Sequence, residues 1–514
     1  MGDNGVVNVG PEPLSFEDVI RVARHGAPVQ LTDDAVAAVA ASRQRVDELA
    51  ESPTPAYGIS TGFGALATRH IDPALRAQLQ RSLVRSHAAG NGPEVETEVV
   101  RALMLLRLHT LATGHTGIRP TTAKTLAALI SSGITPIVHE YGSLGCSGDL
   151  APLAHVALTL MGEGVVRDAS GTVRPAAEAL KQARIEPVEL AAKEGLALIN
   201  GTDGMLGMLI LAIDDLTRLV RTADVSAAMS VEALLGTDRV FAPELQALRP
   251  HPGLALSAAN MTKVLRDSGV MASHRDDCTR VQDAYSLRCA PQVAGAARDT
   301  IAHAATVAGW ELASAVDNPA VLDDGRVESN GNFHGAPVAY VLDFLAVVAA
   351  DLASMSERRT DRFLDVARNH GLPAFLADDP GVDSGHMIAQ YTQAAIVSEL
   401  KRLAVPASVD SIPSSAMQED HVSMGWSAAR KLRKSVDGLT RVLAVEVLTA
   451  ARALDLRAPL EPAPATAAVV RELRETVPAP GPDRFLAPEI ESAVRLVAEG
   501  GVVAAAESVT GPLA

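Results

Sequence analysis

The sequence predicts a mainly α-helical protein, in which a bundle of long helices follows a loop-rich N-terminal region. The first observation behind this prediction is hydrophobic spacing. Within residues 423–456 apolar side chains recur at intervals of three and four, which marks one helix face: Leu432, Val436, Leu439, Leu443 and Val447. The second observation is composition, because only 3% of the residues are aromatic and alanine is abundant, which favours closely packed helices over a β-sandwich.

The N-terminal part of the chain predicts shorter elements. Helical spacing is present in three stretches, 14–50, 75–87 and 99–112. Residues 51–65 are rich in Pro, Gly, Ser and Thr and predict a loop. A short extended piece at 136–138 precedes a helix that we expect to begin at Asp149, with Pro152 tolerated in its first turn.

Long apolar patterns dominate the rest of the chain. Besides 423–456, they occupy residues 203–235, 290–315, 336–357 and 385–404. Long helices with apolar stripes usually pack in a bundle. Several of them in one chain predict a large bundle that also associates with copies of itself.

The C-terminal part predicts a linker or a surface wrap over 457–484, which is rich in Pro and Ala, and a short helix over about 487–508. We therefore expect three regions, or one continuous domain made of all three. They are an N-terminal region with the reactive motifs, the central long-helix bundle and a C-terminal linker with a short helix: 1–202, 203–460 and 461–514.

Composition and charge exclude several classes of protein. A chain of 514 residues with 47% hydrophobic residues can bury a large core. Its net charge of −16 argues against a nucleic-acid partner. The three cysteines, Cys146, Cys278 and Cys289, give no disulfide framework and fit a reducing compartment. The N-terminus has neither a basic start nor an apolar run, and the apolar stretches fall below the ~20 residues of a membrane span, so we expect a cytoplasmic protein with no membrane partner.

The most specific motif is Gly-Ser-Leu-Gly-Cys-Ser-Gly-Asp at residues 142–149. The nitrogen of Gly148 can attack the carbonyl carbon of Cys146, and glycine suits that position because no Cβ blocks the tight turn. Loss of two waters then closes a five-membered ring and converts Ser147 into dehydroalanine. The product is an electrophilic methylidene-imidazolone made from the chain itself. An isolated Cys-Ser-Gly is more often an ordinary turn before a helix, so the motifs that accompany it decide the interpretation.

This triad resembles that of the aromatic amino acid ammonia-lyase and aminomutase family, where the usual triad is Ala-Ser-Gly. The first side chain takes no part in the ring, so we expect the ring here too, although Cys146 places a thiol beside it. The resemblance runs from about residue 14 to 510. It implies a 4-methylidene-imidazol-5-one (MIO) group formed from Cys146, Ser147 and Gly148, a helical fold, and a homotetramer with sites built from several subunits. No metal or nucleotide cofactor is expected, since the sequence has no His-Glu-x-x-His and no clustered Cys/His spacing.

Removal of ammonia from an amino acid needs a base at Cβ, a cation for the carboxylate and donors for developing charge. The resemblance implies that Tyr57, in the run Tyr57–Gly64, is the base. A tyrosine is a weak base at neutral pH and would need a positive neighbour. The family usually has Asn where this chain has Ser60. A loop tyrosine that caps a core is the alternative interpretation.

Other motifs supply the remaining groups. Arg288 presents a planar fork that matches a substrate carboxylate, although an isolated arginine more often forms a structural salt bridge. By resemblance, Gln282 and Tyr285 line the substrate and the electrophile, and Phe333 lies next to the electrophile. Asn200 resembles the family asparagine whose amide donates to the ring oxygen; considered alone, Asn-Gly is a common turn.

Two positions bear on the substrate. His87 resembles the specificity position of the family, and imidazole can hydrogen-bond either an imidazole or a phenol. Glu419 matches a carboxylate of the histidine lyases, where phenylalanine and tyrosine lyases generally have an amide; otherwise it is a surface acid, as most glutamates are. The resemblance therefore implies an ammonia-lyase that converts L-histidine to trans-urocanate and ammonia.

Four alternatives stay open at the level of sequence. The first is a tyrosine ammonia-lyase or aminomutase of the same family. The second is a Cys-His hydrolase that uses Cys146 and His155, and it leaves the Tyr57 loop and Arg288 unexplained. The third is a metal enzyme with ligands among the 14 histidines. The last is a non-catalytic scaffold, which would be marked by loss of Ser147, Tyr57 or Arg288, and all three are present.

Overall fold

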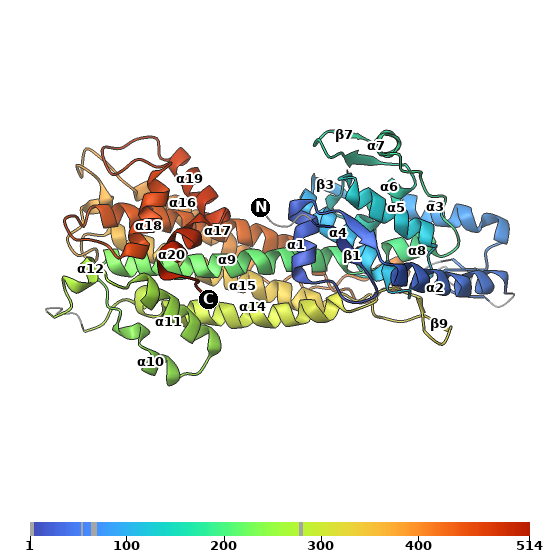
Figure 1. Ribbon diagram of the computed structural model, residues 1–514, viewed down its shortest axis with the longest axis horizontal. Helices are drawn as coiled ribbons and strands as arrows, with labels where there is room; N and C mark the ends of the chain where they lie inside the picture. Colours follow the sequence, from blue (N-terminus) through green and yellow to red (C-terminus); the bar gives the residue numbers. More distant parts are fainter. Residues whose placement is uncertain (1–4, 53–54, 63–68, 277–280) are drawn as a thin grey trace. The chain divides into compact units, whose positions relative to one another are not determined.

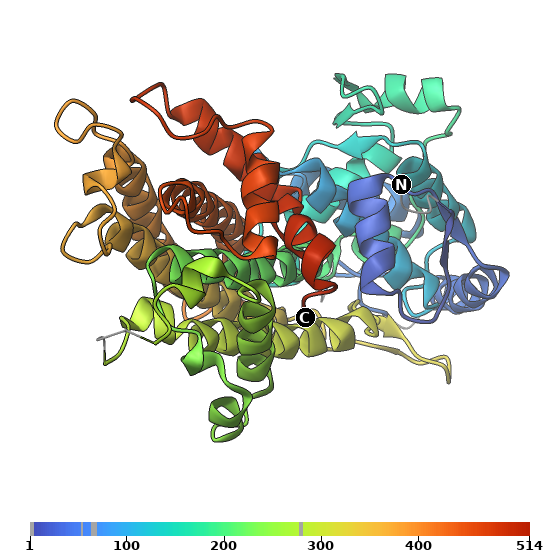
Figure 2. The same cartoon turned by 60° about the vertical axis from the view of Figure 1, so that its left-hand side comes forward.

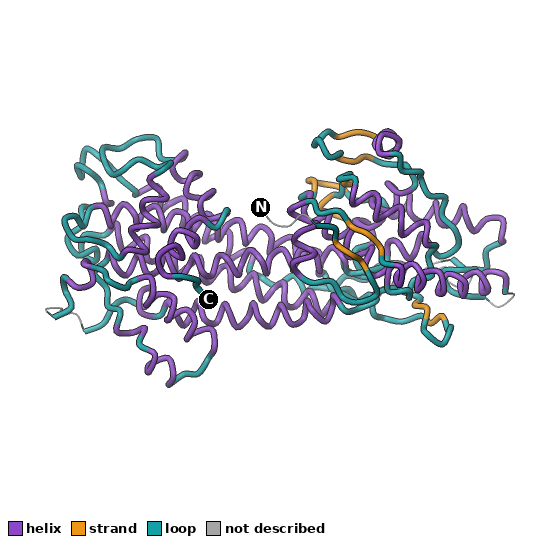
Figure 3. Tube along the Cα trace, viewed as in Figure 1, coloured by secondary structure: helices purple, strands orange, loops and turns teal. Residues whose placement is uncertain are grey.

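The computed structural model describes residues 5–52, 55–62, 69–276 and 281–514, and helices dominate the described chain, as the sequence predicted (Figure 1; Figure 3). Phe63 and Gly64 of the Tyr57 motif, and Cys278, lie outside the described residues. The residues group into two compact units. Unit 1 comprises 1–211, 305–342 and 406–430, and unit 2 comprises 212–304, 343–405 and 431–514. The three consecutive regions expected from the sequence remain a prediction, because each unit is assembled from separate stretches of chain.

Unit 1 combines short helices with small sheets. Its helices are α1 (Phe16–His25), α2 (Asp33–Glu51), α3 (Arg76–His87), α4 (Thr97–Ala112), α5 (Pro120–Ser131), α6 (Leu150–Leu160), α7 (Ala176–Ala183) and α8 (Glu194–Ile199). Its strands are β1 (Val7–Val9), β2 (Val29–Leu31), β3 (Asn91–Glu94), β4 (Thr135–Pro136), β5 (His139–Tyr141), β6 (Val165–Arg167), β7 (Val173–Pro175), β8 (Ala320–Val321) and β9 (Val327–Glu328). The described sheets pair β1 with β2 in parallel, and β3 with β5, β4 with β6, β6 with β7 and β8 with β9 antiparallel.

Four long helices contribute residues to both units. They are α9 (Asp203–Ala233), α14 (Ala290–Leu312), α15 (Ala336–Leu364) and α17 (Gly425–Asp455), in agreement with the long patterns of the sequence. Unit 2 also contains α10 (Pro243–Ala247), α11 (Pro252–Val264), α12 (Gly269–Ala272), α13 (Tyr285–Arg288), α16 (Met387–Leu403), α18 (Pro464–Arg474), α19 (Ala487–Ala498) and α20 (Gly501–Thr510). Helices α18, α19 and α20 lie side by side, in red in both views (Figure 1; Figure 2).

The predicted apolar face of α17 is buried, but the buried surface is wider than that face. Leu432, Leu439 and Leu443 are fully buried, as expected. Val442 and Val445, which lie off the predicted stripe, are equally buried. The part of the helix from Val442 to Leu454 is therefore enclosed by other elements, whereas Lys434 and Asp437 nearer its start are exposed.

The helical pattern predicted over 14–50 is wrong in one respect, because it is interrupted. Helix α1 begins with a capping box at Ser15 and ends at Gly26, which adopts a φ of +69°. Strand β2 follows and pairs with β1 before α2 begins. Glycine in the left-handed conformation followed by Pro28 stops the first helix.

Two C-terminal predictions are also wrong. The expected linker over 457–484 contains α18, which starts with Pro464 in its first turn, where a missing N–H costs nothing. The single helix expected over 487–508 is two helices, α19 and α20, separated at Gly500, whose φ is +81°. Helix α15 is long and apolar enough to cross a membrane, but 61% of its most apolar window is buried inside the structure, as is usual for a helix of a protein core.

Candidate active site

The predicted ring-forming segment joins β5 to α6 and lies against the chain that follows α8. Gly148 has a φ of +77°, and a Cβ on it would come within 1.9 Å of the carbonyl oxygen of Gly201. The two glycines form an isolated β-bridge, and the N–H of Asp149 donates to the Gly201 oxygen at 2.7 Å. Only glycine fits at position 148, for backbone conformation and for space. The absence of a Cβ also favours attack by its nitrogen on the carbonyl carbon of Cys146.

The loop after Glu419 holds the other side of this segment. The N–H of Met424 donates to the carbonyl of Leu144 at 2.9 Å, and the hydroxyl of Ser423 donates to the carbonyl of Gly145 at 3.1 Å. A Cβ on Gly145, whose φ is +67°, would come within 2.1 Å of the Ser423 oxygen. The ring-forming segment is therefore held tightly by two distant parts of unit 1.

Asp149 fixes the end of the segment to the start of α9. One oxygen of its carboxyl accepts the N–H groups of Gly204 and Met205, each at 2.9 Å, and the other accepts the hydroxyl of Ser143 at 3.0 Å. Burial raises the pKa of Asp149 to about 7, and the nearby charge of Asp203 acts in the same direction. The backbone N–H donors and the Ser143 hydroxyl oppose this shift.

We expect Asp149→Asn to gain stability relative to the wild type as the pH rises from about 5 to about 8. The folded carboxyl has a pKa of about 7, above the ordinary value for aspartate. Its contribution to the free energy of unfolding is full at low pH and is lost as the pH rises through about 7. Asparagine does not ionise, so the difference in unfolding free energy between the two proteins changes with pH. Urea unfolding at the two pH values measures it. The exposed Asp34→Asn is the control, and an equal pH response of both variants would contradict the assignment.

Glu419 lies next to Cys146, as its predicted role requires. Burial, followed by the charge of Glu419 and a hydrogen bond to it, raises the pKa of the Cys146 thiol to about 12. The turn before Glu419 is strained, because three consecutive residues other than glycine have positive φ: Ser415, Ala416 and Met417 at 50°, 52° and 69°. The hydroxyl of Ser414 donates to Glu419 Oε2 at 2.7 Å and fixes the carboxylate.

The neutral thiol removes the support for a Cys-His hydrolase. A nucleophilic cysteine needs a thiolate, and the pKa of Cys146 is raised rather than lowered. The Nε2 atom of His155 accepts the N–H of Gly90 at 3.2 Å, so that nitrogen is engaged away from the thiol. Burial also lowers the pKa of His155, with a further contribution from His139.

Asn200 is buried, and its amide is hydrogen-bonded to the chain at residues 317 and 318. Its Nδ2 donates to Asp317 Oδ1 at 3.3 Å and to the carbonyl of Asn318 at 3.0 Å. Phe333 belongs to a motif rich in Gly and Asn at residues 330–335. The side chain of Asn330 donates to the carbonyl of Asp317 at 3.0 Å, which ties this 330–335 motif to the same point. Donation from the Asn200 amide to the electrophile's oxygen stays a prediction, and both amide hydrogens are directed elsewhere in this structure.

Phe333 lies in that motif, half-buried, beside a pair of histidines that the sequence analysis did not single out. His334 Nε2 and His421 Nδ1 are 3.2 Å apart, and the two rings stack with centroids 5.3 Å apart. His421 follows Glu419 by two residues, so the 330–335 motif and the Glu419 loop meet here.

The Tyr57 turn packs through its neighbour Ile59, which is fully buried against Val46 and Val321. The hydroxyl of Ser60 accepts the N–H of Ala56 at 2.9 Å and closes the turn that carries the half-buried Tyr57. Ser60 therefore has a structural task at the place where the family usually has Asn.

His87 ends α3, and the segment after it pairs with the strand before the ring-forming loop. Its Nδ1 lies 2.9 Å from the carbonyl oxygen of Leu83, which can only accept, so this nitrogen carries the hydrogen and Nε2 is an acceptor. Asn91 of β3 pairs with Tyr141 of β5. Within unit 1, short contacts thus link the segments of His87, Cys146–Gly148, Asn200, Phe333 and Glu419. The Tyr57 turn packs on Val46 and Val321.

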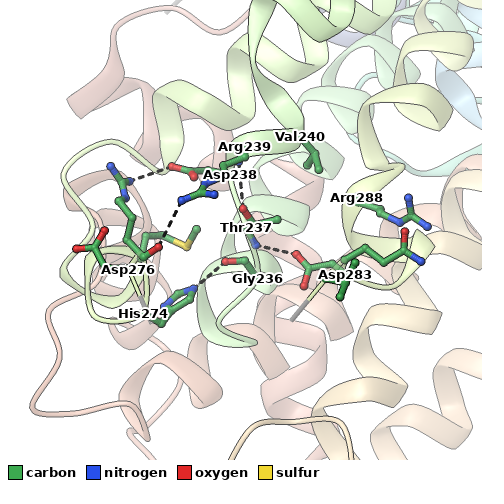
Figure 4. A pocket seen from close by; sticks show the side chains of 13 residues that line it. Gly236, Thr237, Asp238, Arg239, Val240, His274, Asp276, Asp283 and Arg288 are labelled. Carbon is green, nitrogen blue, oxygen red and sulfur yellow. Dashed lines mark hydrogen bonds and ion pairs between the residues drawn. The ribbon is translucent and has the colours of Figure 1, made fainter. Parts of the chain in front are cut away.

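The other predicted residues, Gln282, Tyr285 and Arg288, belong to unit 2. Gln282 and Arg288 line a cavity of about 320 Å³, with Arg288 on the side away from His274 (Figure 4). Tyr285 is 71% exposed, and the guanidinium of Arg288 lies 4.6 Å from the centre of its ring. No acidic side chain pairs with Arg288 among the described residues, and its buried Nε has no hydrogen-bond partner there. The arginine is therefore available for a carboxylate.

Buried contacts set the position of α13, which carries Tyr285 and Arg288. The carboxylate of Asp283, next to the helix, accepts the N–H of Thr237 at 2.7 Å, as Figure 4 shows. Arg359 donates to the carbonyl of Ser286 at 3.2 Å and pairs with Glu446, which is fully buried on α17. Glu446 lies off the apolar face predicted for α17, and its ion pair with Arg359 explains why it is inside.

Further buried residues that sequence reasoning missed support Asn200 in unit 1. Arg107, fully buried on α4, donates to the carbonyls of Asn200 at 2.7 Å and Val316 at 3.1 Å, and it pairs with Asp203. Lys193 pairs with Asp317. The sequence signal for these buried residues is a charged side chain inside an otherwise apolar run, but the sequence alone does not identify the partner of each charge. Among the described residues no group of three or more His, Cys, Asp or Glu has the geometry of a metal site.

The chain belongs to the aromatic amino acid lyase family, whose model matches residues 14–475, and it is therefore a carbon–nitrogen lyase. The chain is 68% identical over 511 residues, 99% of each chain, to a histidine ammonia-lyase of Streptomyces griseus. The structure is similar to the tyrosine aminomutase of Streptomyces globisporus, with a TM-score of 0.93, 39% identity and coverage of 99% of this chain and 100% of that one. It is also similar to the histidine ammonia-lyase of Trypanosoma cruzi, with a TM-score of 0.90, 37% identity and coverage of 98% and 95%.

Proposed function

We propose that this enzyme converts L-histidine to trans-urocanate and ammonia without an oxidant. The observation that carries the proposal is the position of Glu419, whose carboxylate lies against Cys146 of the ring-forming segment. A carboxylate there can accept the N–H of a substrate imidazole, whereas a phenyl ring would leave it without a partner. The 68% identity to a histidine ammonia-lyase over almost the whole chain supports the same substrate.

We further propose that Cys146, Ser147 and Gly148 close into the MIO ring, which supplies an electrophilic carbon to the amino acid. The fit of the residues supports this. Gly148 and Gly145 occupy conformations and spaces that exclude a side chain, and Ser147 between them brings the hydroxyl that leaves as water. The proposed chemistry requires no metal or nucleotide.

The remaining roles follow from the chemistry of each side chain. Tyr57 takes the β-proton of the substrate. Arg288 binds the carboxylate, and Gln282 and Tyr285 line the substrate beside it. His87, at the specificity position, contributes to the recognition of the substrate imidazole beside Glu419. Asn200 and Phe333 complete the surroundings of the electrophile.

A homotetramer in the cytoplasm, with active sites shared between subunits, is part of the proposal. Helix α15 carries an exposed apolar stripe at helical spacing, formed by Tyr340, Phe344 and Val347, which are 51%, 49% and 50% exposed. Such a stripe is typical of a surface that another copy covers. Sedimentation of the purified protein measures the number of subunits.

Turnover of histidine against tyrosine tests the substrate. We expect purified protein and L-histidine to give urocanate, seen by its ultraviolet absorbance, and L-tyrosine to give little coumarate or β-tyrosine. The second candidate is a tyrosine ammonia-lyase or aminomutase, which the similarity to a solved tyrosine aminomutase favours. A faster reaction with tyrosine would establish that candidate and reject the histidine proposal.

Arg288→Lys is expected to raise KM for histidine by roughly tenfold to a hundredfold and to lower kcat less. Lysine keeps the charge but loses the paired donors that orient a carboxylate, and a hydrogen bond to a charged group contributes about 1.5–3 kcal/mol. The matched control is Arg275→Lys, because Arg275 lines the same cavity and pairs with Asp238 instead. Steady-state kinetics of both variants measure the effect. An unchanged KM in Arg288→Lys, or equal binding of histidine and histidinol by the wild type, would show that Arg288 is structural.

A further inference from the structure

Lys193 and Asp317 form an ion pair that is completely buried in unit 1. The side chains of both are 0% exposed, and Lys193 adopts a left-handed φ of +69° just before α8. Asp317 uses one oxygen for Lys193 and the other for the Asn200 amide and the N–H of Asn318, at 3.3 Å and 2.7 Å. Burying two charges is costly even when they pair, so stability alone is a poor explanation for this pair.

The ion pair determines the orientation of the Asn200 amide and therefore which of its two polar atoms has no hydrogen-bond partner. The Nδ2 group has two hydrogens, and both are used, by the carboxylate of Asp317 and the carbonyl of Asn318. A flipped amide would set its oxygen against two groups that can only accept, so the observed orientation is strongly preferred. The oxygen Oδ1 is consequently left over, and it is buried and accepts no hydrogen bond from any described residue.

Unit 2 contains a second triad of a cation, an aspartate and an asparagine, which serves as a structural comparison for Lys193, Asp317 and Asn200. Asn260 donates to Asp224 at 2.9 Å, and Asp224 pairs with Arg298, so a cation, an aspartate and an asparagine are again joined. There the asparagine oxygen accepts the N–H of Ala514 at 3.0 Å. Buried acceptors are usually satisfied. Asp224 Oδ1 of the second triad and Asn369 Oδ1 also lack a partner among the described residues. What distinguishes the Asn200 oxygen is its position beside the ring-forming segment, where a donor from outside the described chain can arrive.

The location of Asn200 identifies that donor. Asn200 precedes Gly201, whose carbonyl holds the ring-forming segment through Asp149. The imidazole N–H of histidine is assigned to Glu419. Of the remaining groups of the substrate, the ammonium can only donate and the carboxylate can only accept. We propose that Lys193 and Asp317 are positioning residues that hold Asn200 as a hydrogen-bond acceptor for the ammonium group of the substrate. This inference rests on the proposed function and deepens it by naming the group that recognises the amine.

The test is the double variant Lys193→Met/Asp317→Asn, in which no buried charge is left unpaired. An amide at position 317 can donate to the Asn200 oxygen, so Asn200 is no longer held as a free acceptor. The matched control is Arg298→Met/Asp224→Asn, which alters the second triad in the same way. Two inhibitors of histidine turnover separate the groups: histidinol has the amine and no carboxylate, and 3-(imidazol-4-yl)propanoate has the carboxylate and no amine. Intact mass shows whether each variant has lost the two waters of ring formation.

We expect the inhibition constant of histidinol to rise roughly tenfold in Lys193→Met/Asp317→Asn, while that of the propanoate changes little. The control should leave the ratio of the two constants as in the wild type. Asn200→Leu, which keeps the ion pair and removes the amide, should shift the same ratio and serves if the double variant does not fold.

An unchanged ratio in Lys193→Met/Asp317→Asn and in Asn200→Leu would overturn the inference. Loss of the two-water mass deficit in both variants would also overturn it, because these residues would then act on ring formation rather than on binding of the amine. Failure of the proposed function is a separate outcome, since the wild type would then not deaminate histidine. If tyrosine is the substrate instead, tyramine and 3-(4-hydroxyphenyl)propanoate replace the two inhibitors, and the same ratio decides.

Discussion

Ser147→Ala abolishes the release of ammonia from L-histidine and leaves fold and assembly intact; this is the largest effect we expect from any single substitution. Ser147 supplies the carbon of the methylidene group, and alanine has no hydroxyl to leave as water. The methyl group of alanine needs no more space than serine, and the neighbouring Gly145 and Gly148, which bear the tight contacts of the segment, are unchanged. Circular dichroism and sedimentation should therefore match the wild type.

Intact-mass measurement makes this prediction independent of activity. The wild type should be lighter than its sequence by two waters, and Ser147→Ala should have its full sequence mass. Cys146→Ala is the matched control, because it restores the usual first residue of the family and should keep the mass deficit. A wild type with full sequence mass and normal activity would contradict the ring.

The long helices could be predicted from the sequence because each carries many turns of one repeating apolar pattern. Regions with only a few turns, or with residues typical of both helices and loops, could not be predicted in this way. Residues 457–484 contain proline and alanine, which suggest a linker by composition, yet alanine is the best helix former and Pro464 stands in the first turn of α18. The break after α1 depends on one residue, Gly26, and on a strand pair between β1 and β2 that no local pattern announces.

The candidate site divides in the same way. Residues inside local motifs, such as Ser147 and Arg288, could be singled out because the reactive side chain and its glycine or polar neighbours are adjacent in the chain. Their supports could not, since Lys193 meets Asp317 across 124 positions and Ser423 meets Gly145 across 278. The reactive residues could be predicted from short stretches of sequence, whereas the orientation of their side chains depends on packing between distant parts of the chain. The Asn200 amide is the clearest case, because its direction follows from acceptors more than 100 positions away.

The contact between Cys146 and Glu419 gives the substrate assignment a test that needs no substrate. The charge of Glu419 raises the pKa of the Cys146 thiol, so its removal should lower that pKa from about 12. In Glu419→Gln we therefore expect faster alkylation of Cys146 by iodoacetamide at a given pH, measured on the Cys146 peptide. An unchanged rate would place Glu419 away from the ring-forming segment.

Glu419→Gln is expected to lower kcat/KM for histidine sharply and to reduce the preference for histidine over tyrosine, with little change in stability. The carboxylate accepts the imidazole N–H, and Ser414 holds it in place through Oε2. Glutamine keeps the size of the side chain but offers a neutral acceptor, and a hydrogen bond to a charged group contributes about 1.5–3 kcal/mol, or roughly tenfold to a hundredfold in kcat/KM. Asp420→Asn, at the exposed neighbouring position, is the control and should change neither rate nor preference.

His87→Phe tests the smaller of the two contributions in the same assay. A phenyl ring removes the Nε2 acceptor and presents an apolar wall, so the variant should admit some phenylalanine while it keeps part of its histidine activity. The deciding quantity is the ratio of kcat/KM for histidine to that for tyrosine, compared between wild type, Glu419→Gln and His87→Phe. Glu419 should account for the larger part of the ratio, because its carboxylate suits the imidazole N–H of histidine and would face the phenol of tyrosine only across a mismatch. A ratio and a histidine rate that stay at the wild-type values in Glu419→Gln would remove Glu419 from the substrate and favour tyrosine instead.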